Sequence, residues 1–413
     1  MSIAFTPIKV GPVTLPNRFI RSGANEMMTR NSVPTRSLLE FHRRLAAGGV
    51  GMTTLAYIAV SPDGRTFASQ GVMNATSVPH YRAIADAVHA EGALISAQIT
   101  HGGSFVQHKE LSTPRAMSSS GGIDKMGVLM GRYFQRQMNR ADMDQVRDEF
   151  VAAARLAVEA GFDAVELHMG HGYLLNQYIS PLSNKRRDDY GGTAEKRVRF
   201  PAEVLAAVKQ AVGARIAVLA KMNLYDGAKG GATVEDGIVT ARALEAAGAD
   251  MLVLSGGRNI ESSYVMFSSP LPYDDLAAMQ PGWLSKLQFK LLKMATPKTV
   301  RFSELYFLEA ARQVRAAVTC GLGYLGGVLS LPAAELALSE GFEAVVMARS
   351  LVHDPDLVAR WREDAAHRSG CTACNRCVAL MYGPSGTHCP VTANEIDPKL
   401  NRIWAGEEMA DAA

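Results

Sequence analysis

The chain has 413 residues, of which 47% are hydrophobic and 20% charged, and its formal net charge is +3. The composition is that of an ordinary globular protein, and the small charge is spread along the chain, so nothing in it indicates a nucleic acid partner. The densest basic cluster, residues 185–187, is followed at once by the aspartates at 188–189. This arrangement favours a locally ion-paired loop over a polyanion site.

The first residues and the cysteines bear on the compartment. Residues 1–10 contain a lysine and a proline and no sustained apolar core, so they do not resemble a signal peptide. No apolar run approaches the roughly 20 residues of a membrane helix. Four of the five cysteines lie between 371 and 389, unlike the spread of a secreted disulfide framework. We expect a cytoplasmic protein without a membrane partner.

Short apolar stretches alternate with segments of helical spacing, after an opening stretch at 5–15 that suits a short lid hairpin. The expected strands are residues 18–21, 50–58, 93–98, 164–167, 216–222, 251–254, a seventh from 317 that leads into 321–327, and 344–347. The expected helices are residues 37–47, 81–90, 143–160, 193–212, 233–248, 303–315, 332–340 and 354–362. Two segments without a period, 104–140 and 256–301, are too long for plain connections and indicate lids or disordered loops.

One local pattern recurs three times. At residues 161–163, 248–250 and 341–343, a helix-ending glycine and an acidic residue precede a buried strand. This repetition indicates serial βα units, and about eight strands alternating with helices favour an α/β fold of the (β/α)8 TIM barrel type, with long excursions after strands three and six. The alternative is an open doubly wound sheet. We expect a barrel over residues 1–365 and a cysteine-containing C-terminal tail over 366–413 that packs on it.

In such a barrel the carboxyl ends of all strands face one basin, where active sites are built. The residues expected at or just beyond these ends are Ser22, Gly23, Ala24, Ala56, Tyr57, Gln98, His168, His171, Tyr173, Lys221, Gly326, Gly327, Ala348 and Arg349. The amide of Gln98 suits a planar heterocycle with its own amide edge. Lys221 supplies a cation where negative charge could sit on such a ring.

The residues at the remaining strand ends suit other parts of the same ligand. Backbone N–H groups at 326–327 and 348–349 suit a phosphate, with Arg349 for charge. His168 and His171 can donate jointly to one oxygen and polarise a carbonyl, and Tyr173 can give a proton. Flavin mononucleotide (FMN), with a pyrimidine edge, a π face and a terminal phosphate, would satisfy these groups together.

Other interpretations of the same residues stay open at this point. The spacing of His168 and His171 could serve a metal, although no acidic triad is near in sequence. Tyr173 could simply pack with its leucine neighbours. The run at 321–326 reads G-x-G-x-x-G, as in dinucleotide folds, but it does not head a βαβ unit, so we interpret it as part of a barrel.

The tail carries four cysteines at a spacing typical of ligands, namely Cys371, Cys374, Cys377 and Cys389. Four thiols within about 20 residues could hold zinc or an iron–sulfur cluster. The alternative, which we favour, is a set of reduced thiols in a compact tail.

The segment 168–200 resembles the old yellow enzyme family of FMN-dependent ene-reductases, the NADH:flavin oxidoreductases. The resemblance lies in the run His-x-x-His-Gly-Tyr-Leu-Leu-Asn-Gln at 168–177 and in Asn-x-Arg-x-Asp-x-Tyr-Gly-Gly at 184–192. Agreement extends from the Pro-Asn-Arg at 16–18 to Pro355, nearly the whole chain. It implies the (β/α)8 barrel.

The resemblance also implies roles for individual residues. His168 and His171 would hold the substrate's activating oxygen, and Tyr173 would protonate Cα. Reduced flavin would deliver hydride to Cβ from N5, after reduction by NADH or NADPH. The flavin would be bound by Ser22, Gly23, Ala24, Asn25, Ala56, Gln98, His168 and Lys221, and its phosphate by Gly326, Gly327, Ala348 and Arg349.

Three features depart from the family pattern. Lys221 stands where arginine is common, which keeps the charge but loses the planar fork, so the flavin potential is expected to shift. The sequence Gly-Ala-Asn at 23–25 replaces the usual Pro-Met-Thr or Pro-Met-Cys, so Asn25 takes the place that tunes the flavin. The tail is similar to that of the 2,4-dienoyl-CoA reductase branch, which holds a 4Fe–4S cluster, but Cys377 stands one residue early. Because that branch also carries a second flavin and nucleotide domain, we expect no redox cluster here.

Taken together, these features predict an FMN-dependent enzyme that reduces the C=C bond of an α,β-unsaturated carbonyl, or a similar activated alkene, at the expense of NAD(P)H. Alternatives are a flavin-dependent oxidase or demethylase, or a dienoyl-CoA-reductase-like enzyme with a metal or iron–sulfur centre in the tail. From another class, the chain could be a metal-binding scaffold whose tail docks a partner. The expected partner is a small molecule, and a homo-oligomer is compatible with the sequence.

Overall fold

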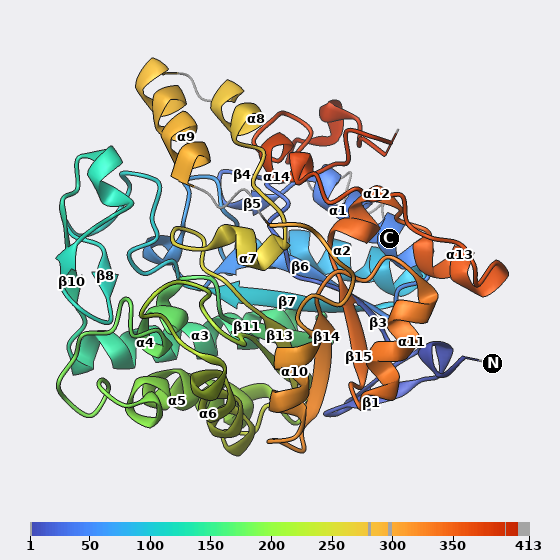
Figure 1. Cartoon of the computed structure of the whole chain (residues 1–413), viewed down its shortest axis with the longest axis horizontal. Helices are drawn as coiled ribbons and strands as arrows, with labels where there is room; N and C mark the ends of the chain where they lie inside the picture. Colours follow the sequence, from blue (N-terminus) through green and yellow to red (C-terminus); the bar gives the residue numbers. More distant parts are fainter. Residues whose placement is uncertain (1, 280–281, 296–299, 393, 404–413) are drawn as a thin grey trace.

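The computed structural model describes residues 2–279, 282–295, 300–392 and 394–403, and it is built around a closed barrel of parallel strands (Figure 1). The strand order is β11-β12-β13-β14-β15-β3-β6-β7. These strands are β3 (Phe19–Arg21), β6 (Met52–Ala59), β7 (Leu94–Thr100), β11 (Ala164–Met169), β12 (Ala217–Asn223), β13 (Met251–Ser255), β14 (Gly321–Leu325) and β15 (Ala344–Met347). The predicted (β/α)8 barrel is confirmed, and the open doubly wound alternative is wrong.

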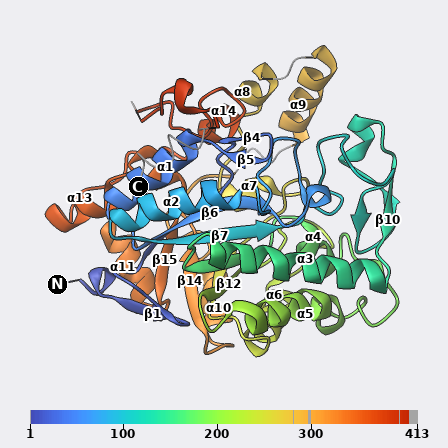
Figure 2. The ribbon, with the colours of Figure 1, turned by 180° about the vertical axis from the view of Figure 1, so that it is seen from behind.

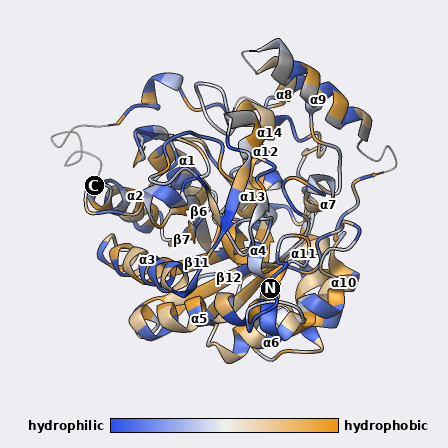
Figure 3. Ribbon diagram, turned by 90° about the vertical axis from the view of Figure 1, so that its left-hand side faces the viewer, coloured by the Kyte–Doolittle hydropathy of each residue, from blue (hydrophilic) through white to orange (hydrophobic). Residues whose placement is uncertain are grey.

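Helices cover the outside of the barrel, as Figure 2 shows for α2, α3 and α5. The main helices are α1 (Arg36–Ala47), α2 (Val78–Ala90), α3 (Arg140–Glu159), α5 (Ala194–Val212), α6 (Val234–Ala246), α10 (Leu308–Arg315), α11 (Leu331–Ser339) and α13 (Leu357–Glu363). Capping boxes set two of the starts, with Asn139 paired to Asp142 and Thr233 to Asp236. Figure 3 shows apolar colour on β11 and β12 and mixed colour on α3, as expected for a buried parallel sheet inside amphipathic helices.

The amino ends of the strands are closed by the hairpin of β1 (Ile8–Val10) and β2 (Val13–Leu15). Its tight turn places Gly11 at φ +56°, in the left-handed region that glycine adopts readily. Apolar residues of the hairpin and of the barrel interior form one cluster, which contains Ile8, Val10, Leu15, Ile20, Met52, Ala164, Ala217, Leu219, Met251, Val253, Ala344 and Val346. The predicted hairpin is therefore present, but it closes the end of the barrel opposite the carboxyl ends rather than acting as a lid over the site.

The two predicted excursions are structured. The first holds β8 (Met117–Ser118), β9 (Gly122–Ile123), the 3-10 turn η3 (Gly127–Met130) and β10 (Phe134–Gln137), and its strands form a three-stranded sheet in the order β8-β10-β9. The second holds α7 (Ser263–Phe267), α8 (Tyr273–Ala278) and α9 (Trp283–Ala295). In Figures 1 and 2, α8 lies beside α14 (Arg376–Leu380) of the tail, and these two helices contact each other.

Short elements fill the other connections. They are η1 (Ile3–Phe5), β4 (Thr29–Arg30), β5 (Val33–Pro34), η2 (Pro62–Gly64), α4 (Leu174–Ile179), α12 (Arg349–His353) and η4 (Pro398–Leu400). Within the described residues, no helix combines the length and apolar character that crossing a membrane would require.

Three element boundaries differ from the sequence prediction. The seventh strand does not begin at 317, because the glycine-rich run itself forms β14. A Cβ on Gly323 would lie 2.8 Å from a methyl group of Val346, so glycine lets β14 lie close against β15. The helix expected at 303–315 begins only at Leu308. The helix expected at 354–362 begins at Leu357 as α13, and the sequence analysis did not predict α12, which precedes it.

Candidate functional site

A polar layer lies inside the barrel, directly above its apolar floor. Alternate residues of a strand point to the same side, so Glu166 and His168 follow Ala164 into the interior, and Lys221 follows Leu219. The strand register pairs Glu166 with Gln98 and His168 with Lys221. Parallel pairing therefore brings together residues from three predicted strand ends.

These interior groups form one hydrogen-bonded network. Glu166 Oε1 accepts a hydrogen bond from Gln98 Nε2 at 2.6 Å and lies 3.1 Å from Lys221 Nζ. Lys221 Nζ also donates to Ser22 Oγ at 3.0 Å and to the carbonyl of Gly23 at 2.8 Å. Burial lowers the pKa of Lys221, and the adjacent Glu166 opposes this effect.

His168, His171 and Tyr173 lie together above this network. The ring centroids of the two histidines are 5.0 Å apart, and that of Tyr173 is 4.4 Å from His168. His168 Nδ1 accepts from the backbone N–H of Gly170 at 3.4 Å, so its own proton lies on Nε2. The aromatic ring of Tyr57, at the end of β6, lies 5.1 Å from that of Tyr173.

Local contacts hold His171 in an unusual backbone conformation, with φ +62°. Its N–H donates to Asn223 Oδ1 at 3.1 Å, and its Nε2 lies 2.8 Å from Ser255 Oγ. Asn223 donates in turn to the carbonyl of Gly257 at 2.9 Å. The turn that carries His171 is thus tied to the ends of β12 and β13.

Burial determines the protonation of all three aromatic groups. It lowers the pKa of His171 to about 3, with a further contribution from Lys221, and it holds the pKa of His168 well below its usual value. It also raises the pKa of Tyr173 to about 12, against the opposing effects of Tyr57 and Asn259. At neutral pH the site therefore presents two uncharged imidazoles and a protonated phenol.

The loop after β3, residues 22–26, is held by a buried ion pair. Arg21 Nη1 lies 2.5 Å from Glu26 Oε1, and Arg21 Nη2 donates to the carbonyl of Ala24 at 3.1 Å. Glu26 Oε2 accepts from the N–H of Ala56 at 3.2 Å. The predicted residues at the ends of β3 and β6 are thus held side by side.

The predicted phosphate residues lie beside the second excursion. The carbonyl of Gly326 accepts from the N–H of Tyr306 at 3.1 Å, and a Cβ on Gly327 would lie 2.9 Å from the Phe302 ring. The Arg349 guanidinium lies 5.5 Å from the centroid of the same ring. Ala348 immediately precedes α12.

The side chain of Arg349 also has partners within the chain. It donates to Asn375 Oδ1 at 2.6 Å, to Ser269 Oγ at 3.1 Å and to the carbonyl of Phe267 at 2.8 Å. The sequence did not predict this role of Arg349 in joining the second excursion to the tail.

The tail reaches the loop after β3. Thr387 donates from its N–H to the carbonyl of Glu26 and from Oγ1 to that of Asn25, each at 2.9 Å. Tyr382 of the tail lies close enough to Tyr173 to help raise its pKa, and Tyr57 in turn helps to raise the pKa of Tyr382. Residues more than 350 positions apart in the sequence therefore approach one site.

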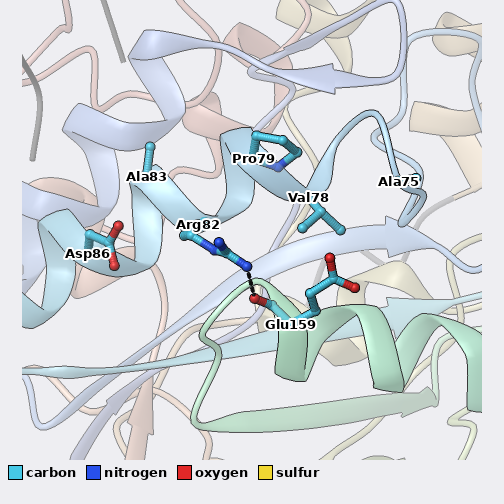
Figure 4. Close-up of a pocket in the computed structure, with 7 residues that line it drawn as sticks. All are labelled: Ala75, Val78, Pro79, Arg82, Ala83, Asp86 and Glu159. Carbon is cyan, nitrogen blue, oxygen red and sulfur yellow. Dashed lines mark hydrogen bonds between the residues drawn. The ribbon is translucent and has the colours of Figure 1, made fainter. Parts of the chain in front are cut away.

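A shallow hollow of about 270 Å³ lies elsewhere, between α2 and the end of α3 (Figure 4). Arg82 crosses it and donates to the backbone carbonyl of Glu159. None of its lining residues belongs to the predicted site.

Several residues of the site were assigned no role in the sequence analysis. Glu166 carried a detectable signal, because it is charged, stands within an apolar strand and shares a face with His168. Arg21 is likewise a charged residue in an otherwise apolar strand, β3. Ser255, Glu26 and Tyr382 have no such local signal, because their roles depend on contacts between distant segments.

A model of the NADH:flavin oxidoreductase / NADH oxidase family matches residues 4–274. The chain belongs to this family. The resemblance to old yellow enzymes is thereby confirmed, and the chain is an FMN-dependent oxidoreductase that uses a nicotinamide nucleotide as reductant.

Relatives of this family differ in length and in the substrate that their names give. The chain is 39% identical over 393 residues to the 4,4'-dithiodibutanoate disulfide reductase of Rhodococcus erythropolis, with 94% of each chain covered. It is 28% identical to the metal reductase of Desulforamulus reducens, covering 95% of this chain but only 54% of that protein. The old yellow enzyme homologue of Zymomonas mobilis has a TM-score of 0.69 at 21% identity, with 94% of this chain and 97% of that chain covered, which shows a shared fold.

The site residues fit the family's cofactor. Gln98 Oε1 is buried and has no hydrogen-bond partner among the residues that the structure describes, which is costly unless a ligand supplies a donor. A flavin pyrimidine edge carries such an N–H group. Lys221 adds a fully buried cation beside the same amide.

The four tail cysteines lie close together in the structure. Cys371, Cys374, Cys377 and Cys389 line one cavity of about 20 Å³ together with Arg349 and Asn375. Among the residues that the structure describes, however, no three potential ligands group as they would around a metal ion. Zinc or a 4Fe–4S cluster at these thiols stays the alternative to the reduced thiols that we favour, and the reaction proposed below does not use one.

Proposed function

We propose that this oxidoreductase reduces the C=C bond of α,β-unsaturated carbonyls, or of similarly activated alkenes, at the expense of NAD(P)H. The observation that carries the proposal is the group formed by His168, His171 and Tyr173. It places two neutral imidazoles and one protonated phenol above the buried amide of Gln98.

Each residue of this group has a distinct task in such a reaction. The imidazoles of His168 and His171 bind the carbonyl oxygen and stabilise the negative charge that develops on it. Their lowered pKa values keep them as uncharged donors at neutral pH. FMN, when bound, supplies a hydride from N5.

Tyr173 supplies the proton to the carbon next to the carbonyl. Because burial raises its pKa and keeps its phenol protonated, Tyr173 is available as an acid at neutral pH. Tyr57 and Asn259 face the same hydroxyl and favour its phenolate, so they assist the departure of the proton.

The proposal is tested with the reduced holoenzyme. Cyclohexenone is mixed with it anaerobically, and reoxidation of the flavin is followed by absorbance together with formation of cyclohexanone. We expect reoxidation of the flavin and formation of cyclohexanone to proceed at the same rate. Reduction of the flavin by NADH and by NADPH, followed by no reoxidation with any activated alkene, would contradict the proposal.

A second candidate is the reduction of a small organic disulfide. It is favoured by the relative from Rhodococcus erythropolis, whose name gives that activity and which covers 94% of the chain. In that reaction a hydride would break the S–S bond to give a thiol and a thiolate. Tyr173 would then protonate the thiolate.

The two candidates are separated by one comparison. Reoxidation rates of the reduced holoenzyme are measured with cyclohexenone and with 4,4'-dithiodibutanoate at equal concentrations. Release of thiol is followed with a thiol reagent. A much faster reaction with the disulfide would make the second candidate the better description.

A further inference from the structure

Glu166 is a buried carboxylate in the centre of the flavin site, and the reaction proposed above does not use it. It is 1% exposed and lies in a strand otherwise composed mainly of apolar residues. Burying a carboxylate costs several kcal/mol unless charge and hydrogen bonds compensate. Here both are supplied by the two neighbours to which flavin binding is assigned, Gln98 and Lys221.

We propose that Glu166 is a positioning residue for the flavin, which orients the Gln98 amide and offsets the charge of Lys221 so that the bound flavin has a lower reduction potential. This inference rests on the proposed flavin site, but it does not depend on which substrate is reduced.

The orientation of Gln98 follows from its contacts. A carboxylate only accepts hydrogen bonds, so Glu166 must face the amino end of the amide, as the 2.6 Å contact with Nε2 shows. The amide oxygen is then turned away from Glu166 and is buried, and no group in the described part of the chain forms a hydrogen bond with it. A flavin pyrimidine N–H is the matching donor, whereas the opposite orientation would present an amino group.

The backbone of Gly23 closes the remaining space around the amide. A Cβ at this position would lie 2.5 Å from Gln98 Nε2 and 3.1 Å from Glu166 Oε1. The amide is therefore confined between the carboxylate and this backbone.

The partners of Lys221 determine how it acts on the flavin. An ammonium group has three N–H donors, and Lys221 directs them to Ser22 Oγ, the carbonyl of Gly23 and Glu166 Oε1. With its donors engaged, Lys221 acts on the ring as a charge rather than as a hydrogen-bond donor. Glu166, at 3.1 Å, offsets much of that charge.

The sign of the effect follows from the charge of the flavin. Reduction adds negative charge to the ring, and an uncompensated cation nearby stabilises it. By offsetting Lys221, Glu166 weakens this stabilisation and makes the reduced flavin a stronger hydride donor.

The test is the midpoint potential of FMN in the Glu166→Gln holoenzyme, measured by anaerobic spectroelectrochemical titration. The substituted side chain keeps an oxygen acceptor for the Gln98 amide but removes the charge. We expect the ratio of the affinities for reduced and oxidised FMN to rise at least tenfold, which for a two-electron couple is about 30 mV. A potential equal to or below that of the wild type would overturn the proposal.

Two further variants keep the test decisive. Lys221→Met removes the cation that Glu166 offsets and is expected to lower the potential, so it tests the charge on which the proposal depends if Glu166→Gln does not fold. An unchanged potential in Lys221→Met would contradict the proposal. Glu343→Gln is the matched control, because Glu343 pairs with Arg315 at 3.2 Å away from the network, and it should leave the potential unchanged.

The outcomes are distinguishable from failure of the proposed function. If the potentials shift as expected but no alkene is reduced, the proposed function fails and this inference stands. If alkenes are reduced while the potential of Glu166→Gln does not rise, only the inference about Glu166 fails.

Discussion

The rings of Tyr173 and His168 lie 4.4 Å apart at an interplanar angle of 56°, at the point where β11 passes into the following loop. The phenol is thus placed beside a neutral hydrogen-bond donor rather than beside a base. This relationship separates the group that binds oxygen from the group that gives the proton, and it leads to the first prediction.

Replacing Tyr173 by phenylalanine should slow alkene reduction and spare reduction of the flavin by NAD(P)H. Loss of a positioned acid typically costs about 10²–10⁴ in rate. The two half-reactions are measured separately by stopped-flow absorbance. Tyr264→Phe, in α7, is the control and should change neither rate; equal rates for Tyr173→Phe and wild type would show that another group gives the proton.

The lowered pKa of His171 predicts an acid-sensitive fold. Its folded-state pKa of about 3 lies below the unfolded value of about 6.5, so the unfolded state binds more protons between these values. Stability from this group is complete above about pH 6.5 and falls as the pH drops towards 3, by about 2 kcal/mol at pH 5. The free energy of unfolding, measured with urea, should fall less between pH 7 and pH 5 for His171→Asn than for the wild type.

His89 provides a control of opposite sign. Its hydrogen bond to Asp163 raises its pKa, so the stability that it contributes is present below about pH 6.5 and is lost as the pH rises through the folded-state pKa. His89→Asn should therefore lose more stability relative to wild type at pH 5 than at pH 8. If the effect of both substitutions on the free energy of unfolding changed with pH in the same direction, the lowered pKa assigned to His171 would be contradicted.

A methyl group on Gly23 should impair flavin binding. The Cβ of Gly23→Ala would lie 2.5 Å from Gln98 Nε2, so the amide must move, at a cost of about 1–3 kcal/mol for overpacking. We expect a fall of roughly tenfold or more in FMN affinity, measured by flavin fluorescence during titration of apoprotein. Gly121→Ala is the control, because the atoms of the described residues nearest to its Cβ would lie 3.8 Å away.

The tail should affect binding of the alkene substrate rather than reduction of the flavin by NAD(P)H. Tyr382 lies near Tyr57 and Tyr173, and the tail is anchored by the bonds from Thr387 to residues 25 and 26. Tyr382→Ala is expected to raise KM for the alkene several-fold and to leave reduction by NAD(P)H unchanged. Tyr133→Ala, an exposed tyrosine of the first excursion, should have no effect on either. An unaltered KM for Tyr382→Ala would place the tail outside the substrate site.

The sequence alone was sufficient to predict the barrel and many of the residues that lie in the site. Short apolar strands between amphipathic helices are local patterns, and a closed parallel sheet is a fold that buries all of them. Gln98, His168 and Lys221 were found because they interrupt such patterns at strand ends, where a barrel collects polar residues. The run at 321–326 was predicted to follow the seventh strand, whereas residues 321–325 form the strand itself. Glycine is rare inside strands, and only the contact with Val346 shows why it is needed there.

The tertiary structure alone decided how these residues are connected. The pairing of Glu166 with Gln98 and Lys221 depends on strand register, which is set by hydrogen bonds between segments that lie far apart in sequence. The engagement of Arg349 by Asn375 and the approach of Tyr382 to Tyr173 depend on loop closure over long distances along the chain. Periodicity shows which face of an element is buried, but only the folded chain shows what that face meets.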